Sequence, residues 1–237
     1  EPKTIAQVKG TLVHAALEKT HELPRDERTY PRAVKFLKPE WELMCEKDTE
    51  LKELVPEDET LDFLIDARDL VKGCFQMENP QGFDAKAVEM YVDTVLPNNV
   101  PVRGFIDRVD EAPTGQVRVV DYKTGKKPKP QYSHDAQFQM RFYALVYWRI
   151  HGVIPTQLRL MYLKVFDSMF LMPSREELEY FERDLGNLWA KIEGDGKEGV
   201  FRPKKSKLCG WCSFQDLCPA FGGTPPEYPG WPGSTAD

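Results

Sequence analysis

Three ionisable residues near the middle of the chain have a spacing that can bring two carboxylates and one ammonium group together. Asp107 lies in one run rich in β-branched and aromatic residues, 104–110, and Asp121 and Lys123 lie in a second, 119–125. Carboxylate oxygens are good ligands for hard divalent cations, which polarise a phosphoryl oxygen and lower the pKa of bound water. Because a nearby ammonium can hold the attacking water or stabilise the growing charge, the pattern predicts phosphodiester hydrolysis.

The segment between the two runs predicts how these residues meet. Residues 111–116 are rich in Pro, Gly and polar side chains, and the β-branched flanks favour a β-hairpin. Its strands would bring Asp107 and Asp121 together. Because side chains at i and i+2 share one face of a strand, Lys123 would join them while Tyr122 points into the opposite layer.

The neighbouring residues argue against an ordinary surface location for this group. An Asp-x-Lys segment on a strand usually faces water, but Ile106, Val119 and Val120 make this hairpin apolar. Charged groups embedded among such residues need a partner or a metal ion, because unpaired burial is costly. The hairpin is therefore predicted to carry a site.

Two other segments carry candidate residues on expected helices. His14 lies in an amphipathic stretch, 11–18, that Thr11 is expected to cap. Its neutral imidazole could complete a metal site, although a lone histidine on a helix is more often structural. Gln139 and Tyr143 are four residues apart in an apolar, aromatic stretch, so they would share one helix face, where core packing is the alternative.

Three of the five cysteines lie within ten residues of one another. Cys209, Cys212 and Cys218 have a C-x2-C-x5-C spacing, whereas Cys45 and Cys74 stand apart and are expected to be small buried hydrophobic residues in helices. An odd number of cysteines without a signal segment is a poor disulfide scaffold. The cluster is therefore predicted to bind tetrahedral zinc or a [4Fe-4S] cluster, each of which needs a fourth ligand.

These motifs, taken in chain order, resemble those of the PD-(D/E)XK nuclease superfamily over about residues 10–221. Asp107 with Asp121 and Lys123 resembles the nuclease core. Residues 10–14 resemble the histidine motif of the RecB-like branch, and residues 139–143 resemble its Gln-x-x-x-Tyr motif. The cysteine cluster is similar to the C-terminal tail of the iron–sulfur members of that branch.

The resemblance implies roles for the candidate residues. It implies a bound Mg²⁺ or Mn²⁺ and a catalytic role for Lys123. Gln139 would support the metal site or the attacking water, and Tyr143 would steady the DNA backbone or the active-site helix. Glu89, in an alternating strand pattern before the hairpin, is considered only as a support for the ligands. The implied metal ligands are His14, Asp107, Asp121 and the backbone carbonyl of Tyr122.

The cysteine cluster departs from the pattern of similar nucleases, which supply a fourth cysteine upstream of the Gly-x-x-x-His motif. Only nine residues precede Gly10, and none is cysteine. Because the chain begins with Glu1, we expect a trimmed segment, and a [4Fe-4S] cluster in the intact protein. It would staple the C-terminal tail to an N-terminal helix and shape the DNA path. An absent or incomplete cluster, or one completed by Cys45 or Cys74, is the alternative.

Composition and charge limit the class of protein. With 237 residues, 41% of them hydrophobic, the chain can bury one substantial core. It has neither a membrane-spanning run nor a basic-then-apolar leader, so a soluble, cytoplasmic protein is expected. The net charge of −6 argues against a protein that coats DNA. Two basic segments, 118–129 and 202–207, nevertheless flank the expected site and the cysteines; solvated loops are the alternative.

The order of the expected elements predicts an α/β fold. A restriction-endonuclease-like mixed central sheet would be flanked by helices, with a helical insertion and a C-terminal cysteine-rich segment. Ser174 and Glu177 form a capping box that begins the last long helix. The expected organisation is one nuclease domain over 1–221, made of a helical layer or cap at 24–80, a nuclease core at 83–200 and a cysteine segment at 201–221, then a flexible tail at 222–237.

The function predicted from these features is a divalent-metal-dependent deoxyribonuclease, specifically an exonuclease of DNA recombination or repair. Its substrate would be single-stranded DNA or DNA with free ends. A CRISPR-associated RecB-like nuclease that processes DNA ends shares the motifs, and a non-cutting DNA-binding subunit is the other alternative. A helicase or recombination protein is an expected partner, because the chain has no Gly-x-x-x-x-Gly-Lys motif of its own.

Overall fold

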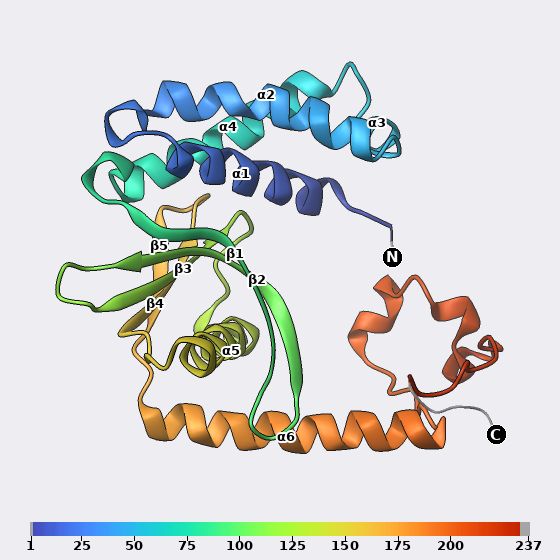
Figure 1. Ribbon diagram of the computed structural model, residues 1–237. Coiled ribbons are helices and arrows are strands. Elements are labelled where there is room, and N and C mark those ends of the chain that lie inside the picture. The colour runs from blue at the N-terminus through green and yellow to red at the C-terminus, as the bar shows by residue number, and fades with distance from the viewer. Residues whose placement is uncertain (1, 233–237) are drawn as a thin grey trace. The chain divides into compact units, whose positions relative to one another are not determined.

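A five-stranded mixed sheet organises the first part of the chain, and the computed structural model describes residues 2–232. The strands lie in the order β1-β2-β3-β4-β5 (Figure 1). Neighbouring strands are antiparallel except β3 and β4, which are parallel. This sheet confirms the predicted α/β class. The strands are Ala85–Val95, Pro101–Glu111, Val117–Lys123, Gln157–Tyr162 and Asp167–Leu171.

The helix α5, His134–His151, connects the two parallel strands. Parallel neighbours require such a crossover, because a tight turn can only join antiparallel strands. The helix lies on the opposite side of the sheet from α1, α2 and α4 (Figure 1). Its buried residues include Met140, Ala144 and Tyr147, which recur at helical spacing and form its apolar face. Helices therefore flank the sheet on both sides, as the sequence predicts.

Residues 24–80, predicted as a helical layer or cap, contain three α-helices, and α1 packs with them. The core of this layer joins side chains of the helices with Val120, Tyr122 and Met161 of the sheet and with Leu163, which directly follows β4. Cys45 and Cys74 are buried in this layer as free thiols, as expected. Its helices are α1 (Ile5–Glu22), α2 (Tyr30–Lys47), α3 (Leu51–Leu54) and α4 (Thr60–Met77).

The first helix begins earlier than the sequence analysis expected. Thr4 is its N-cap and forms a capping box with Gln7, so the prediction that Thr11 caps this helix is wrong. Thr11 lies inside the helix and donates from Oγ1 to the Gln7 carbonyl, a bond that an interior helical threonine can make. The Thr-x-x-Gln capping box at residues 4–7 therefore sets the start of the helix, in preference to the single threonine at residue 11.

The predicted hairpin is present as β2 and β3, joined by a turn in which Gly115 has φ of +83°. Only glycine adopts that conformation without strain. β1 and β2 form a second, longer hairpin, and their register continues from Val88 opposite Arg108 to Val95 opposite Pro101. β2 pairs with β3 only from Arg108 to Glu111. Residues 101–107 therefore belong to a two-stranded ribbon.

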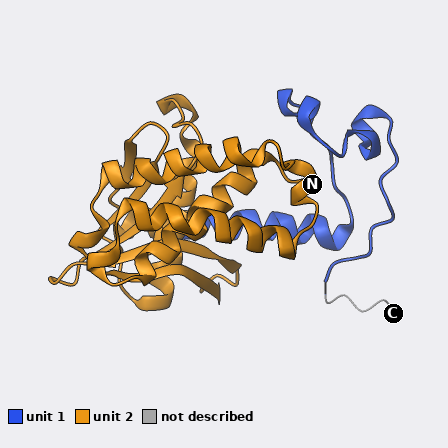
Figure 2. Ribbon diagram, turned by 90° about the horizontal axis from the view of Figure 1, so that it is seen from above, with its two compact units in different colours: residues 1, 182–237 blue, residues 2–181 orange. Residues whose placement is uncertain are grey.

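The helix α6, Arg175–Glu198, runs from the first compact unit along the chain, residues 2–181 (orange in Figure 2), into the second, which contains residues 182–232 (blue in Figure 2). Ser174 and Glu177 form the predicted reciprocal cap: each backbone N–H donates to the side chain of the other residue. The expectation of a single domain over residues 1–221 stays a prediction.

The second unit contains the cysteine segment and the start of the predicted tail. The segment is a series of short 3₁₀ turns at Lys207–Trp211, Gln215–Leu217 and Pro219–Phe221. Residues 222–232 contain no helix or strand. Tyr228 nevertheless packs against Phe201, with ring centroids 4.9 Å apart. The last five residues of the predicted tail, 233–237, lie outside the described part of the chain.

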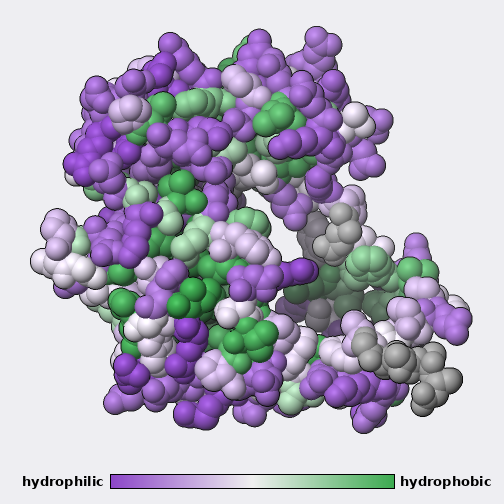
Figure 3. Space-filling model, in the orientation of Figure 1, coloured by the Kyte–Doolittle hydropathy of each residue, from purple (hydrophilic) through white to green (hydrophobic). Residues whose placement is uncertain are grey.

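The surface of the helical layer is mostly hydrophilic in the view of Figure 3, and larger apolar groups appear below it, over the strands and α5. In the described part of the chain, every helix is too short or too polar to span a lipid bilayer.

Candidate metal centre

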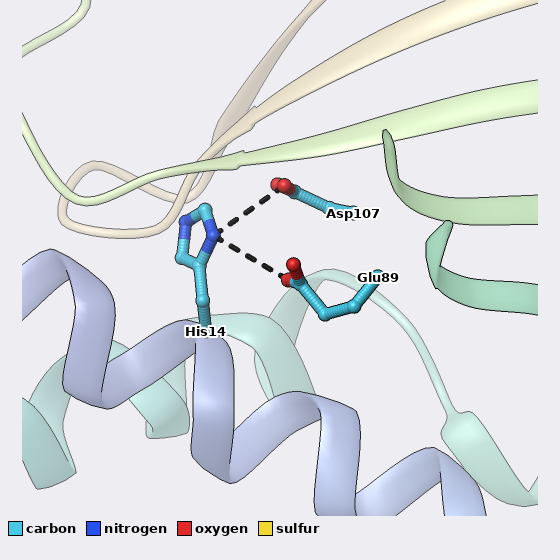
Figure 4. A group of neighbouring side chains, drawn as sticks. All are labelled: His14, Glu89 and Asp107. Carbon is cyan, nitrogen blue, oxygen red and sulfur yellow. Dashed lines mark ion pairs between the residues drawn. The ribbon is translucent and has the colours of Figure 1, made fainter. Parts of the chain in front are cut away.

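Three side chains from three different elements converge beside the sheet. His14 projects from α1 toward Glu89 of β1 and Asp107 of β2 (Figure 4). Its Nδ1 atom lies 3.4 Å from Asp107 Oδ1 and 4.0 Å from Glu89 Oε1. The potential donor atoms of His14, Glu89 and Asp107 all lie within 4.8 Å of one another, which makes these three a possible metal site in the described part of the chain. An imidazole nitrogen and two carboxylates form a donor set that suits a divalent cation.

The backbone of Tyr122 positions two of these ligands. Its N–H donates to Asp107 Oδ2 over 2.7 Å, and its carbonyl accepts from His14 Nε2 over 2.8 Å. Because a carbonyl only accepts, the proton of the imidazole lies on Nε2 and the lone pair of a neutral ring lies on Nδ1. In the neutral ring, the form that binds a metal ion, Nδ1 therefore faces the carboxylates with its lone pair. Without a metal ion the pKa of about 9 keeps Nδ1 protonated at neutral pH, paired with Asp107. Metal-binding histidines are commonly oriented by such a bond from the second ring nitrogen.

A second group lies beside the first, on β3 and α5. Lys123 Nζ lies 2.7 Å from Asp121 Oδ2 and donates to Gln139 Oε1 over 2.7 Å. Gln139 Nε2 in turn donates to Asp121 Oδ1 over 3.1 Å. The three polar ends thus form a closed triangle that fixes the ammonium of Lys123. Gln139 reaches it because α5 is the crossover that follows β3.

The carboxylates affect one another electrostatically. Burial and the charge of Asp107 raise the pKa of Asp121 to about 6, although Lys123 acts in the opposite direction. Burial and Asp107 also raise the pKa of Glu89. Burial opposes the charge of His14, but Asp107, Asp121 and the Tyr122 carbonyl raise its pKa to about 9. A cation would relieve this crowding of negative charge, so the residues present fit a divalent metal ion.

The structure distributes the predicted ligands over the two groups. His14 and Asp107 lie in the first, and Asp121 lies in the second with Lys123 and Gln139. Asp121 is linked to the first group through the next residue, Tyr122, whose backbone contacts both His14 and Asp107. The Tyr122 carbonyl accepts from His14, which leaves its second lone pair for an ion.

Glu89 contributes more directly than the sequence analysis expected, since its carboxylate belongs to the converging group itself. In the register of β1 and β2, Val88 lies opposite Arg108 and Met90 lies opposite Ile106, so Glu89 and Asp107 lie between these two pairs. Glu89 has φ of +43°, an uncommon value for a residue other than glycine. The pairing register of β1 with β2 is the signal that could have identified it.

Tyr143 lies on the same helix as Gln139, one turn further along. Burial raises the pKa of its phenol, while Gln139 acts in the opposite direction through a side-chain hydrogen bond. A Cβ atom at Gly104 would lie 3.8 Å from the Tyr143 ring. Tyr143 therefore lies between Gln139 and the β2 strand that carries Asp107, and its hydrogen bond with Gln139 links it to the second group.

The cysteine segment does not form a closed site in the described part of the chain. The thiols of Cys209, Cys212 and Cys218 do not all come within 4.8 Å of one another, and a fourth cysteine does not join them. The Ser206 N–H donates to Cys209 Sγ over 3.2 Å. As they stand, these residues do not fit a four-ligand zinc or iron–sulfur site.

The basic segment at residues 118–129 contains both ion-paired and unpaired side chains. Arg118 pairs with Asp110, and Lys127 pairs with Asp167. Lys126 and Lys164 form no ion pair among the described residues. Both line a pocket of about 420 Å³ that begins directly after Lys123. Other residues that line it are Lys9, Asp66, Thr124, Gly125 and Phe166.

A buried charged cluster lies on the other side of β3, under the helical layer. Arg108 is fully buried and pairs with Glu78 and Asp110. It also donates to the Tyr122 hydroxyl, and its Nη1 lies 3.2 Å from His21 Nε2. The sequence analysis did not identify this cluster. The side chain of Tyr122 is thus held on one face of β3, whereas the side chains of Asp121 and Lys123 lie on the other face.

Comparisons with known proteins agree with this geometry. The model of the PD-(D/E)XK nuclease superfamily matches residues 1–219. A crystal structure from Eubacterium rectale, described as a "putative exonuclease", has a TM-score of 0.55 and 12% sequence identity, covering 90% of this chain and 74% of its own. The crystal structure of SSO0001 has 16% identity to this chain, covers 75% of it and 80% of its own length, and has a TM-score of 0.39. A comparison with curated proteins found no match.

The likeness to the Eubacterium rectale structure supports the fold, a mixed sheet flanked by helices. The family model spans nearly all of the sequence, including the segments that carry His14, Asp107, Asp121 and Lys123. On these grounds, the chain belongs to the PD-(D/E)XK nuclease superfamily.

Proposed function

We propose that this protein is a divalent-metal-dependent deoxyribonuclease that hydrolyses phosphodiester bonds, and that it belongs to the RecB-like branch of its superfamily. The observation that carries the proposal is the convergence of His14, Glu89 and Asp107 beside the Asp121, Lys123 and Gln139 triangle. A metal-ligand group adjoining a fixed ammonium supplies the parts that metal-assisted phosphoryl transfer needs.

The proposed ligands of a Mg²⁺ or Mn²⁺ ion are His14, Asp107, Asp121 and the Tyr122 carbonyl, and Glu89 is added by its position in the donor group. When bound, the ion supplies Lewis acidity toward the phosphate and lowers the pKa of bound water.

The proposed catalytic residue on this chain is Lys123. Its ammonium would orient the attacking water or stabilise negative charge on the phosphate, and Gln139 would hold it in place through the bond to Nζ. The Tyr143 hydroxyl would contact the DNA backbone beside Gln139.

We further propose exonuclease action in DNA recombination or repair. The name of the Eubacterium rectale neighbour supports the exonuclease part. A CRISPR-associated nuclease that processes DNA ends uses the same kind of site and is a second candidate. A non-cutting DNA-binding subunit is less well supported, because Asp107, Asp121 and Lys123 are all present and Lys123 pairs with Asp121. A helicase or recombination protein is the proposed partner.

An iron–sulfur cluster that includes Cys209, Cys212 and Cys218 stays a separate proposal. Its support is the C-x2-C-x5-C spacing and the Ser206 N–H donated to Cys209. Iron and acid-labile sulfide assays on anaerobically purified protein would test it, and a Cys212→Ser variant is the control. Absence of both elements in the purified protein would contradict the cluster.

The nuclease proposal is tested with end-labelled linear and circular DNA, single- and double-stranded, in Mn²⁺, Mg²⁺ or EDTA. Metal-dependent loss of linear but not circular DNA is expected, and the labelled end gives the polarity. Asp121→Ala should abolish cleavage while its circular dichroism spectrum is unchanged. Glu111→Ala, an exposed carboxylate on the same sheet, is the matched control that should retain activity. Equal activity of the Asp121 variant would contradict the mechanism.

A further inference from the structure

Two aromatic side chains stand exposed on the ribbon formed by β1 and β2. Tyr91 and Phe105 are directly opposite one another in the register, and each is 54% exposed. Their ring centroids are 5.1 Å apart, with planes inclined by 50°. Large aromatic groups seldom stand so open in pairs, because burying their area is favourable. This pair therefore presents ring surface to solvent.

The pair is continuous with the candidate metal centre. Phe105 and Asp107 are two residues apart on β2, so their side chains lie on the same face of that strand. Their separation along the strand is about 7 Å, which equals about two stacked nucleotides at about 3.4 Å each. A nucleic-acid strand whose phosphate sits at Asp107 would thus place its neighbouring bases beside Phe105 and Tyr91.

An arginine next to the pair suits contact with a phosphate of the same strand. Arg103 is exposed beyond Phe105 and forms no ion pair in the described residues. Asp93, opposite Arg103 in the register, instead accepts a hydrogen bond from the Tyr91 hydroxyl over 2.7 Å. That bond fixes the tilt of the Tyr91 ring. A free guanidinium next to two open rings can contact both a phosphate and a base.

We propose that Tyr91 and Phe105 form a stacking platform for unpaired bases, and that the substrate strand is single-stranded DNA where it meets the metal centre. This proposal rests on the proposed nuclease function. In a duplex the base faces are covered by their neighbours, so only an unpaired strand can offer them to protein rings. Stacking on aromatic side chains tolerates any sequence, because every base has such a face.

The ordinary alternative is that this pair only stabilises the hairpin, as cross-strand aromatic pairs do. The two roles make different predictions. A hairpin role would affect folding and would weaken all DNA substrates alike. A platform would favour single strands and would respond to the removal of individual bases.

Binding is measured with the full chain carrying Asp121→Ala, in EDTA, by anisotropy of labelled single-stranded and duplex oligonucleotides. Tyr91→Ala and Phe105→Ala are each expected to weaken single-strand binding about tenfold. Tyr91→Phe keeps the ring and should bind like the parent. The matched control is Phe170→Ala, because Phe170 is 50% exposed on β5, at the opposite edge of the sheet.

A second measurement scans the oligonucleotide with single abasic sites. The parent should lose affinity when the missing base is one that stacks, whereas the alanine variants should be indifferent at those positions. If every variant bound like the parent, or if abasic sites had no position-dependent effect, the platform would be excluded.

The outcomes separate this proposal from the nuclease itself. Platform-dependent binding without metal-dependent cleavage by the unmodified chain would overturn the proposed function and keep the platform. Cleavage that persists unchanged in the Tyr91 and Phe105 variants would keep the function and overturn the platform.

Discussion

Arg108 donates a hydrogen bond to the hydroxyl of Tyr122, the residue that separates Asp121 from Lys123. The two strands that carry the candidate site are thereby tied together on their far face, beneath the helical layer. Arg108 is fully buried, and its charge is balanced by Glu78 and Asp110. A buried cation of this kind is tolerated only with such partners.

Arg108→Met is expected to destabilise the fold by about 3–5 kcal/mol, because the carboxylates of Glu78 and Asp110 would be left buried without their main partner. Tyr122→Phe removes only one hydroxyl and should cost about 1–2 kcal/mol, with cleavage retained. Urea denaturation followed by tryptophan fluorescence measures both. Similar stabilities for the two variants would show that the cluster does not depend on the arginine.

Glu89→Gln is expected to weaken Mn²⁺ binding about tenfold or more, since one carboxylate of the converging group loses its charge. Titration calorimetry in the absence of DNA measures the affinity directly. Glu111→Gln, on the neighbouring strand, serves as the control. An unchanged affinity in the Glu89 variant would return this residue to the supporting role that the sequence suggested.

His21 should make stability depend on pH. Burial and the charge of Arg108, with a smaller contribution from Arg28, lower its pKa from 6.5 to about 4, against the opposing charge of Glu78. The folded protein therefore holds His21 neutral, and its full stabilisation is present above pH 6.5. As the pH falls toward 4, the unfolded state gains the proton first, and about 3 kcal/mol is lost.

The measurement is the free energy of unfolding in urea at several values between pH 7 and pH 4. In a His21→Asn variant the slope over this range should be smaller, whatever the variant's stability at pH 7. Parallel slopes would rule out His21 as the source.

Gly73 of α4 marks a close approach between the helical layer and the sheet. A Cβ atom there would lie 2.1 Å from the Leu163 carbonyl oxygen, which is backbone and cannot rotate away. Gly73→Ala is therefore expected to destabilise the protein by about 3 kcal/mol. Gly194→Ala, in α6, meets no atom within 4 Å and should stabilise its helix by about 1 kcal/mol. Thermal unfolding of the two variants should thus shift in opposite directions.

Lys126 and Lys164 are expected to contact phosphates of the substrate, since both line the pocket that follows Lys123. Removing each should reduce the slope of log affinity against log salt by about 0.7 for single-stranded DNA. Lys38→Ala, in an exposed pair with Glu42 on α2, is the control. If the slope stays the same in the double variant, this pocket is not on the DNA path.

Local patterns in the sequence were enough for the central hairpin. Alternation placed Tyr122 on the opposite face from Asp121 and Lys123, and the structure has Tyr122 in the helical core while the other two contact Gln139. The turn residues around Gly115 and the cap at Ser174 are likewise local signals. Such features follow from the preferences of a few neighbouring residues, which is why they could be read without the fold.

Features that depend on distant pairing could not be predicted in this way. Glu89 enters the donor group through the register of β1 with β2 and a positive φ that no residue preference indicates. Glu78 meets Arg108 only because α4 ends over the sheet. The residue identities that form these contacts are ordinary, so their importance appears only when the chain is folded.

The bond from His14 to Tyr122 joins residues 108 positions apart, whereas Asp107 through Gln139 lie on one continuous stretch. During synthesis α1 leaves the ribosome long before its sheet partner exists. A nascent chain that has formed only its N-terminal helices thus lacks the donor group altogether, and one that has formed only the hairpin lacks the imidazole. The donor group can therefore form only when a long loop closes. In a time-resolved refolding experiment, Mn²⁺ binding should appear together with the final cooperative step of folding.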